Sequence, residues 1–496
     1  MRYTFKGTSY PVYDPDKGAG FLQSIPEDMA NYPERYGGVI AQSTESLPLL
    51  FLADMEPGTY RISVHLRGSS RLFAQRRRLY AAFQGEGEHA ITFVTMVADV
   101  ISDYDKKRYP NNRIALVFTG NPEILSIEIT ACAVPVVWLA GDSTVADQNG
   151  ILPYDPGLSY CGWGQMLSMF FPEDRALFSL ARSGLTTDTF RSQGHYDVMY
   201  ERLKAGDYVF IQFGHNDQKV PELLPEGRYR DNLLRYLEEI RGKQAVPVLV
   251  TPLARNSWYC SNGNYNDLLL AYAGAVREAA RKAGCLLLDL HRISKEYIIA
   301  KGLEGAKPYF YPGDYTHTND YGGYLVAKMI WQETVENPAL GEIGRLLLPP
   351  ESDPGMEMEA WAGWLYPPHP SSPDCQGVRT ITALEALQYV QKAYKYFAVN
   401  PLGSEPEAVT AARQNGYLVD SLTAPDRPIS WREWAELLVL ACQGRNGSFQ
   451  VPEYNARPEA PVDWQPGVKY ARWLEQTASG CPETEPDGMT IPVAGS

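Results

Sequence analysis

The sequence lacks long apolar runs and has a deficit of positive charge. No stretch approaches the ~18 consecutive apolar residues that cross a bilayer, which argues against a membrane partner. Acidic residues outnumber basic ones by 59 to 45, for a formal net charge of −14. This surplus argues against a nucleic acid or an anionic membrane surface as the partner. A neutral polysaccharide and a local basic pocket are both compatible with it.

Cysteine is also scarce. The seven cysteines are scattered, odd in number and without a CxxC pair, so they do not form a disulfide framework. The first residues, Met1-Arg2-Tyr3, are not followed by the apolar segment of a secretory signal. Together these features predict a cytoplasmic location, whereas a chain whose signal peptide had been removed would be secreted. No feature of the sequence specifies an oligomeric state.

A chain of 496 residues predicts two to four domains. Residues 1–133 contain short segments of period-two alternation, such as 60–66 and 113–118, and turn residues separate them. This pattern is typical of an antiparallel β-sandwich.

Residues 134–345 have a different texture. Nearly continuous apolar strands alternate with longer helical patterns; the strands are 136–139, 209–211, 246–250 and 286–288, and the helices include 229–240 and 268–283. Strands without alternation are buried on both faces, so this region is predicted to be an α/β domain with a parallel sheet covered by helices. In such sheets, ligands bind beyond the carboxyl ends of the strands.

The last part of the chain is predicted to be a Pro-rich linker, 346–378, followed by a mainly helical region, 379–496. Segments 381–387 and 429–435 echo one another, and each has Thr or Ser three residues before Glu, which is a capping box. The echo weakly resembles an S-layer-homology module. A generic helical appendage is the alternative.

Ser143 lies in a Gly-Asp-Ser turn after the apolar run 134–140. A Ser-Thr pair after a glycine is usually a turn or a helix cap, so the motif alone is weak. Its place at the end of the first predicted strand favours a nucleophile, because the turn directs the hydroxyl into the crevice. The backbone N–H of Ser143 is also a candidate oxyanion donor.

Asn216 belongs to a polar cluster, 214–217, at the end of the strand predicted at 209–211. Three interpretations are open: an Asx turn, an amide that donates to a developing oxyanion, and a metal site formed by His215 and Asp217. No other histidine or cysteine lies at ligand spacing nearby, so no metal is expected.

Asp314 and His317 form an Asp-x-x-His pair in a late loop. At this spacing a local turn lets the carboxylate accept from one imidazole nitrogen and leaves the other nitrogen facing a hydroxyl. Of the seven histidines, His317 is the best candidate base, because His195 and His291 lack an adjacent acid of this kind. A nucleophile, an oxyanion donor and a base with its carboxylate are together the equipment of acyl transfer.

These motifs resemble those of the SGNH (GDSL-like) hydrolases, and within them the rhamnogalacturonan acetylesterase group, carbohydrate esterase family 12. The matching segments are 138–145, 162–165, 206–217 and 314–317. The resemblance implies a three-layer α/β hydrolase fold with a flavodoxin-like parallel sheet. It also implies a catalytic triad of Ser143, Asp314 and His317, and an oxyanion hole formed by Ser143, Gly184 and Asn216.

Gly184 lies in segment 179–187, which is similar to the second block of the family. Ala181 and Gly184 match that block, whereas Ser179 and Leu185 stand where the family usually has asparagine and arginine. The oxyanion hole needs only the backbone N–H of Gly184. The missing arginine affects how a polysaccharide would be held, and hence the substrate.

Residues 1–133 also resemble the galactose-binding-like β-sandwich that precedes the catalytic domain in some bacterial members. Either sugar binding or a packing role is compatible with this likeness.

The resemblance implies a serine esterase that removes O-acetyl groups from a plant cell-wall polysaccharide or oligosaccharide, with rhamnogalacturonan (pectin) as the leading candidate. It implies no metal and no organic cofactor. Two alternatives are open: a non-catalytic carbohydrate-binding or cell-wall protein on the same scaffold, and an esterase for another acetylated glycan such as xylan. A nucleotide-dependent enzyme is not expected, because no glycine-rich phosphate loop follows the first strand.

Overall fold

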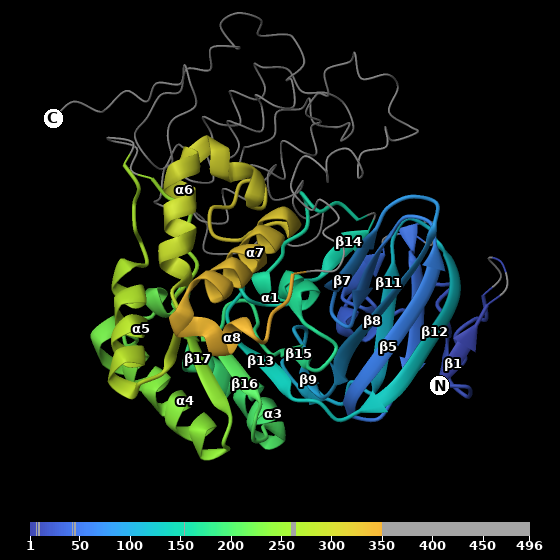
Figure 1. Ribbon diagram of the computed structural model, residues 1–496, viewed down its shortest axis with the longest axis horizontal. Helices are drawn as coiled ribbons and strands as arrows, with labels where there is room; N and C mark the ends of the chain where they lie inside the picture. The colour runs from blue at the N-terminus through green and yellow to red at the C-terminus, as the bar shows by residue number, and fades with distance from the viewer. Residues whose placement is uncertain are drawn as a thin grey trace, which may run out of the picture. The chain divides into compact units, whose positions relative to one another are not determined.

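The computed structural model describes residues 1–349, apart from 6, 8, 9, 42, 44, 45, 153 and 259–263. Residues 1–256 and 267–349 belong to one compact unit (Figure 1). Most of the predicted linker, 346–378, lies outside the described residues. The predicted helical region 379–496 and its S-layer-like echo lie outside them as well.

Two antiparallel sheets form the N-terminal region. The first contains, in spatial order, β1 (Arg2–Thr4), β12 (Glu123–Cys132), β5 (Gly58–Arg67) and β8 (Glu88–Val97). The second contains β2 (Ala19–Phe21), β4 (Leu49–Asp54), β11 (Arg113–Phe118), β6 (Ser70–Ala74) and β7 (Arg78–Phe83). Side chains from both sheets, such as Val64 and Leu116, form one fully buried core. The alternating pattern of the sequence therefore predicts this two-sheet arrangement correctly, while its likeness to galactose-binding domains stays a prediction.

A five-stranded parallel sheet forms the centre of the second region. Its order is β15 (Ala176–Ser179), β13 (Val136–Gly141), β16 (Tyr208–Gln212), β17 (Val246–Val250) and β18 (Leu286–Leu288). This is the flavodoxin-like order 2-1-3-4-5, as expected. Every residue of β13 is buried, which explains the continuous apolar run in the sequence.

Helices cover both faces of this sheet (Figure 1). Val137 and Leu139 of β13 pack on one face with α1 (Trp163–Leu167), α7 (Asp320–Glu336) and α8 (Gly341–Gly344). Trp138 and Ala140 point to the other face and pack with α2 (Thr189–Ser192), α3 (His195–Arg202), α4 (Arg230–Gly242) and α5 (Leu270–Ala283). α6 (Leu290–Ala306) follows β18. The region is thus a three-layer α/β domain.

The β-sandwich and the α/β domain share apolar cores. Phe73 of β6 and Leu79 of β7 belong to the same buried cluster as Leu167 of α1. Two short pairings lie outside the main sheets, β9 (Val100–Ile101) with β10 (Arg108–Tyr109), and β14 (Gly150–Leu152) with β3 (Val39–Ala41). The second pairing joins a loop of the α/β domain to the N-terminal region.

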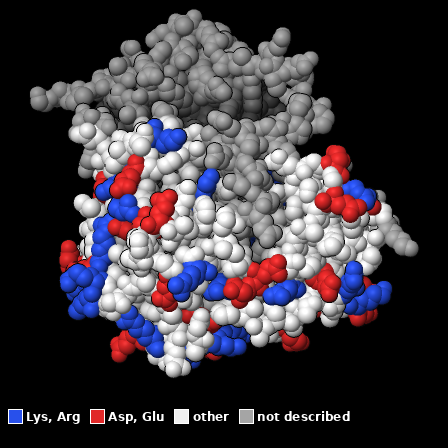
Figure 2. All heavy atoms as spheres, viewed as in Figure 1, with Lys and Arg blue, Asp and Glu red and all other residues white. Residues whose placement is uncertain are grey.

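Among the described residues, the helices fall short of the length and apolar character that crossing a membrane requires. Basic and acidic side chains lie interspersed on the molecular face shown in Figure 2.

Candidate active site

The loop before α7 brings a histidine and an aspartate to the serine at the end of β13. Ser143 Oγ lies 2.8 Å from His317 Nε2, and His317 Nδ1 lies 2.7 Å from Asp314 Oδ2. The serine is 6% exposed, so its hydroxyl is close to the surface but largely shielded from water. The three side chains therefore form one continuous hydrogen-bonded chain, with the histidine in the middle.

Asp314 is fixed by its own turn. Its Oδ1 accepts hydrogen bonds from the backbone N–H groups of Thr316 and His317, at 2.7 and 2.9 Å. Burial by itself would raise the pKa of this carboxyl, but the hydrogen bonds from His317 and the turn outweigh it and lower the pKa below its usual value. An ionised Asp314 is suited to hold the imidazole in one tautomer and to stabilise the imidazolium.

The turn that carries Ser143 is held by its neighbour Asp142. The Oδ1 atom of Asp142 accepts from the backbone N–H and the hydroxyl of Thr144, at 3.0 and 2.8 Å. Its Oδ2 atom lies 3.2 Å from His215 Nδ1. Gly141 at the end of the strand has no room for a side chain, because an added Cβ would lie 2.7 Å from the carbonyl oxygen of Gln212. The serine is therefore presented by a crowded and well-connected turn.

The side chain of Asn216 bonds to the residue that follows Gly184. Gly184 has φ +82°, a left-handed conformation that favours glycine. The side-chain amide of Asn216 donates to the carbonyl of Leu185, the residue after Gly184, at 3.1 Å. Within the described part of the chain, the N–H groups of Ser143 and Gly184 donate no hydrogen bond. Both are thus available to an oxyanion.

His215 and Asp217 have structural partners. His215 Nε2 lies 2.9 Å from the carbonyl oxygen of Leu253, so both of its ring nitrogens are engaged. Asp217 accepts from the N–H and hydroxyl of Thr187, at 2.8 and 2.7 Å. Among the residues that the structure describes, no three His, Cys, Asp or Glu side chains are grouped so as to hold a metal ion.

The sequence is similar to known proteins of one family. The GDSL-like Lipase/Acylhydrolase family matches residues 139–323. The chain is 32% identical over 207 residues to the rhamnogalacturonan acetylesterase RhgT of Bacillus subtilis, which covers 39% of this chain and 87% of that protein. The chain belongs to the GDSL-like lipase/acylhydrolase family. It is a carboxylic ester hydrolase.

Two further relatives of this GDSL-like hydrolase extend the comparison. The rhamnogalacturonan acetylesterase of Emericella nidulans is 26% identical over 218 residues, covering 38% of this chain and 81% of that protein. The uncharacterized esterase YxiM of Bacillus subtilis is 25% identical over 342 residues, covering 65% of this chain and 84% of that protein. The second match is longer than the α/β domain, so it extends beyond that domain.

The sequence does not reveal one residue that joins the two halves of the site. The Gln148 side-chain amide donates to the carbonyl of Ser143 at 2.9 Å and to the hydroxyl of Ser183 at 3.1 Å. A glutamine in a loop has no pattern that marks it, and the only available signal is its position five residues after the nucleophile.

The structure adds a partner for His291 that no sequence spacing reveals. His291 does have a carboxylate partner, since its Nε2 lies 2.8 Å from Asp267 Oδ1. The acid is 24 residues away along the chain and therefore escapes a search for local pairs. The His291 ring is fully buried, so it does not compete with His317 as a base that meets substrate.

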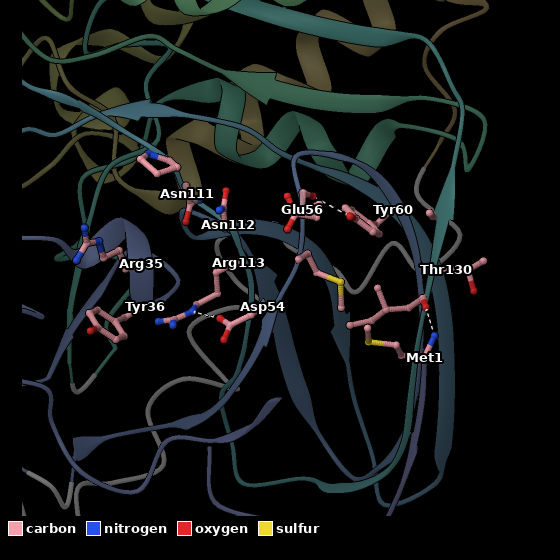
Figure 3. A pocket seen from close by; sticks show the side chains of 14 residues that line it. Met1, Arg35, Tyr36, Asp54, Glu56, Tyr60, Asn111, Asn112, Arg113 and Thr130 are labelled. Atoms are coloured by element: carbon pink, nitrogen blue, oxygen red, sulfur yellow. Dashed lines mark hydrogen bonds and ion pairs between the residues drawn. The ribbon is translucent and has the colours of Figure 1, made fainter. Parts of the chain in front are cut away.

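A large cavity of the hydrolase lies away from these residues. It has a volume of about 830 Å³ and is lined by the β-sandwich and its loops (Figure 3). The ion pair of Arg113 and Asp54, with 2.9 Å between Nε and Oδ1, faces it near Tyr36, and Tyr60 lines it next to Glu56. The serine site therefore lies in the α/β domain, whereas this cavity lies in the β-sandwich.

Proposed function

We propose that this hydrolase is a serine esterase that removes O-acetyl groups from acetylated plant cell-wall polysaccharides or oligosaccharides. The observation that carries the proposal is the hydrogen-bonded chain of Ser143, His317 and Asp314 at the carboxyl end of the sheet. Relatives named as rhamnogalacturonan acetylesterases support the acetyl ester as the bond that is cleaved.

Acylation follows from this geometry. His317 Nε2 takes the Ser143 proton while Oγ attacks the acetyl carbonyl carbon. The carbonyl oxygen becomes an oxyanion, which accepts hydrogen bonds from the N–H groups of Ser143 and Gly184 and from the Asn216 amide. The tetrahedral intermediate then expels the sugar oxygen, which takes the proton from His317, and an acetyl-enzyme is left on Ser143.

Deacylation repeats the same steps with water. His317 accepts a proton from water as the water oxygen attacks the acetyl carbon. The second tetrahedral intermediate collapses, acetate leaves, and Ser143 Oγ recovers the proton from His317. Asp314 stays ionised throughout and stabilises the imidazolium formed in each half-reaction.

Rhamnogalacturonan is the substrate that we propose, because two cations border the oxyanion residues. Lys219 Nζ donates to Asn216 Oδ1 at 3.1 Å, and Arg255 Nη2 donates to the carbonyl of His215 at 3.3 Å. The galacturonate units of rhamnogalacturonan carry carboxylates, whereas a plain xylan backbone is neutral. Cations beside the site favour the acidic polymer through electrostatic complementarity.

The substrate is tested by measuring acetate release from a panel of acetylated pectins, xylans and mannans. We expect the highest kcat/KM on acetylated rhamnogalacturonan. Equal or greater activity on xylan would make the pectin assignment wrong and leave the esterase assignment intact.

The chemistry is tested with Ser143→Ala on an acetylated chromogenic ester. We expect loss of turnover with an unchanged melting temperature, and Ser63→Ala on β5 serves as the control serine. Wild-type activity in Ser143→Ala would refute the mechanism. Glycan binding without any acetate release by the wild-type protein would instead favour a non-catalytic carbohydrate-binding protein.

A further inference from the structure

We propose that the hairpin between β6 and β7 of the β-sandwich is a positioning element of the esterase site. Its three consecutive arginines, Arg76, Arg77 and Arg78, enter the α/β domain and fix the loop 147–149 and the start of α7. The inference rests on the proposed serine esterase function. The N-terminal sandwich would support catalysis indirectly, by holding residues that position Ser143 and His317.

Arg77 makes the central contact. Its Nη1 donates to both carboxylate oxygens of Asp320, at 2.8 and 2.6 Å, and its Nε donates to the carbonyl of Gln148 at 3.2 Å. Its Nη2 donates to the carbonyl of Tyr160 at 2.5 Å. Arg77 is 1% exposed and Asp320 is fully buried. A sandwich side chain is therefore buried in the α/β domain as one partner of an ion pair.

Arg76 and Arg78 bond to the two loop residues that flank Gln148. Arg78 Nε donates to Asp147 Oδ2 at 2.9 Å, and both side chains are almost fully buried. Arg76 Nε donates to Asn149 Oδ1 at 3.2 Å. All three residues of loop 147–149 are thus bonded to consecutive arginines of one hairpin.

Loop 147–149 is connected directly to the reacting residue. Gln148, whose backbone carbonyl accepts from Arg77, donates its side-chain amide to the carbonyl of Ser143 and to the hydroxyl of Ser183. Ser143 carries the nucleophile, and Ser183 immediately precedes Gly184. Displacement of Gln148 would therefore move the nucleophile and one oxyanion donor relative to each other.

The other end of the Arg77 contact leads to the general base. Asp320 begins α7 and follows His317 by three residues. The side chain of Asn319 caps this helix by accepting from Gly322 N–H at 3.0 Å. Arg77 thus binds Asp320, three residues after the base His317. It also binds Gln148, which in turn bonds to the Ser143 carbonyl.

The hairpin adopts an unfavourable backbone conformation in this position. Gln75 and Arg77 adopt φ values of +55° and +54°, a left-handed conformation that is unfavourable for residues with a side chain. Removing Arg77, Arg78 and their carboxylates from water also costs free energy. Apolar residues in the same places often give equal or greater stability than a buried ion pair. Strained turns and buried charges are expected where geometry has to be fixed.

The test compares Arg77→Met and Arg77→Lys with wild type in the full chain, using an acetylated chromogenic ester. We expect Arg77→Met to lower kcat about 10²-fold with little change in KM, because misplaced reacting groups cost that much. Arg77→Lys is expected to restore part of kcat, since it keeps the charge but loses the bidentate geometry. The matched control is Arg113→Met, which breaks another ion pair of the sandwich and is expected to leave kcat unchanged. A wild-type kcat in Arg77→Met would overturn the proposal.

A double-mutant cycle separates positioning from stability. If Arg77 acts through Gln148, the losses of kcat in Arg77→Met and Gln148→Met are less than additive when combined, whereas losses that arise independently add. Fully additive losses would overturn the proposal. Should Arg77→Met fail to fold, Arg76→Met takes its place, because its ion-pair partner Asp103 is 37% exposed whereas Asp320 is fully buried. Arg76→Met with wild-type kcat would count equally against the proposal.

Ser143→Ala distinguishes the two proposals. Activity in Ser143→Ala refutes the serine mechanism itself. An inactive Ser143→Ala together with a fully active Arg77→Met refutes only the positioning role of the hairpin.

Discussion

At the scale of single residues, Asn216 is the one side chain among the three oxyanion donors that we propose, so it can be removed by substitution. Its amide has two N–H groups, and one of them donates to the Leu185 carbonyl. We expect Asn216→Ala to lower kcat by about 10²–10³-fold with a nearly unchanged melting temperature, as removal of one oxyanion donor does. Kinetics on a chromogenic acetyl ester measure this, with Asn112→Ala of the sandwich as the control. A loss smaller than about tenfold would remove Asn216 from the oxyanion hole.

Asp217 predicts how stability depends on pH. Burial raises its pKa from 3.8 to about 6, although Thr187 donates two hydrogen bonds to it. The folded state therefore holds the proton more tightly, so this contribution to stability is complete below pH 3.8 and is lost as pH rises through about 6. The free energy of unfolding of wild type should fall by about 3 kcal/mol relative to Asp217→Asn between pH 3 and pH 7. Denaturant titrations at each pH measure it, and exposed Asp231→Asn is the control; parallel curves for wild type and Asp217→Asn would contradict the prediction.

The sequence allows some of these residues to be found and not others. Asp314 and His317 can be paired because they are three residues apart, and Ser143 and Asn216 because each ends a predicted strand. The contact of Arg77 with Asp320 joins residues 243 positions apart, which no local spacing reveals. Three arginines in a row also suggest a solvated surface, although all three are buried. The signal that was available is their position between two apolar strand segments.

At the scale of elements, the start of α7 is packed so closely that two glycines are needed there. An added Cβ on Gly322 would lie 1.8 Å from the carbonyl oxygen of Tyr309, and one on Gly323 would lie 2.6 Å from Cys161 Sγ. Gly322→Ala should therefore destabilise the protein by about 1–3 kcal/mol and lower kcat, because it displaces the helix that follows His317.

The matched control for this helix is Gly274→Ala in α5, where no atom outside the local helix backbone lies within 4 Å of an added Cβ. It should stabilise the protein by about 0.5–1 kcal/mol, since alanine is the better helix former. Thermal unfolding and chromogenic-ester kinetics of both variants measure the difference. Equal stability of the two variants would show that the start of α7 tolerates a side chain.

Most elements of the parallel sheet can be predicted because their sequences are apolar at every position. The runs 136–139, 209–211, 246–250 and 286–288 fall within β13, β16, β17 and β18, with ends that differ by at most two residues. β15 and α7 escape prediction for physical reasons. β15 has the sequence Ala-Leu-Phe-Ser, which ends in a polar residue and gives no long apolar run. α7 begins with Asp-Tyr-Gly-Gly, which has low helix propensity and depends on tertiary packing.

At the scale of the whole molecule, the α/β domain depends on the sandwich for its charge balance. A chain that begins at residue 134 leaves Asp147 and Asp320, both no more than 1% exposed, without their arginines. Each broken pair costs about 3–5 kcal/mol, and the sum approaches the 5–15 kcal/mol that stabilises a typical protein. We expect the truncated chain to be insoluble or unfolded, as measured by soluble yield and circular dichroism beside the full chain. A soluble truncated enzyme with wild-type kcat would contradict both this dependence and the positioning role of the hairpin.

The distance between Arg77 and Asp320 along the chain also has a consequence for synthesis. The two residues are 243 positions apart, and ribosomes add about 5–20 residues per second, so the arginine is made about 12–50 s before its carboxylate. N-terminal domains generally fold first. We therefore expect the sandwich and its hairpin to be folded before Asp320 and the adjacent His317 are made. On this expectation, the proposed active site is completed only once translation has reached α7.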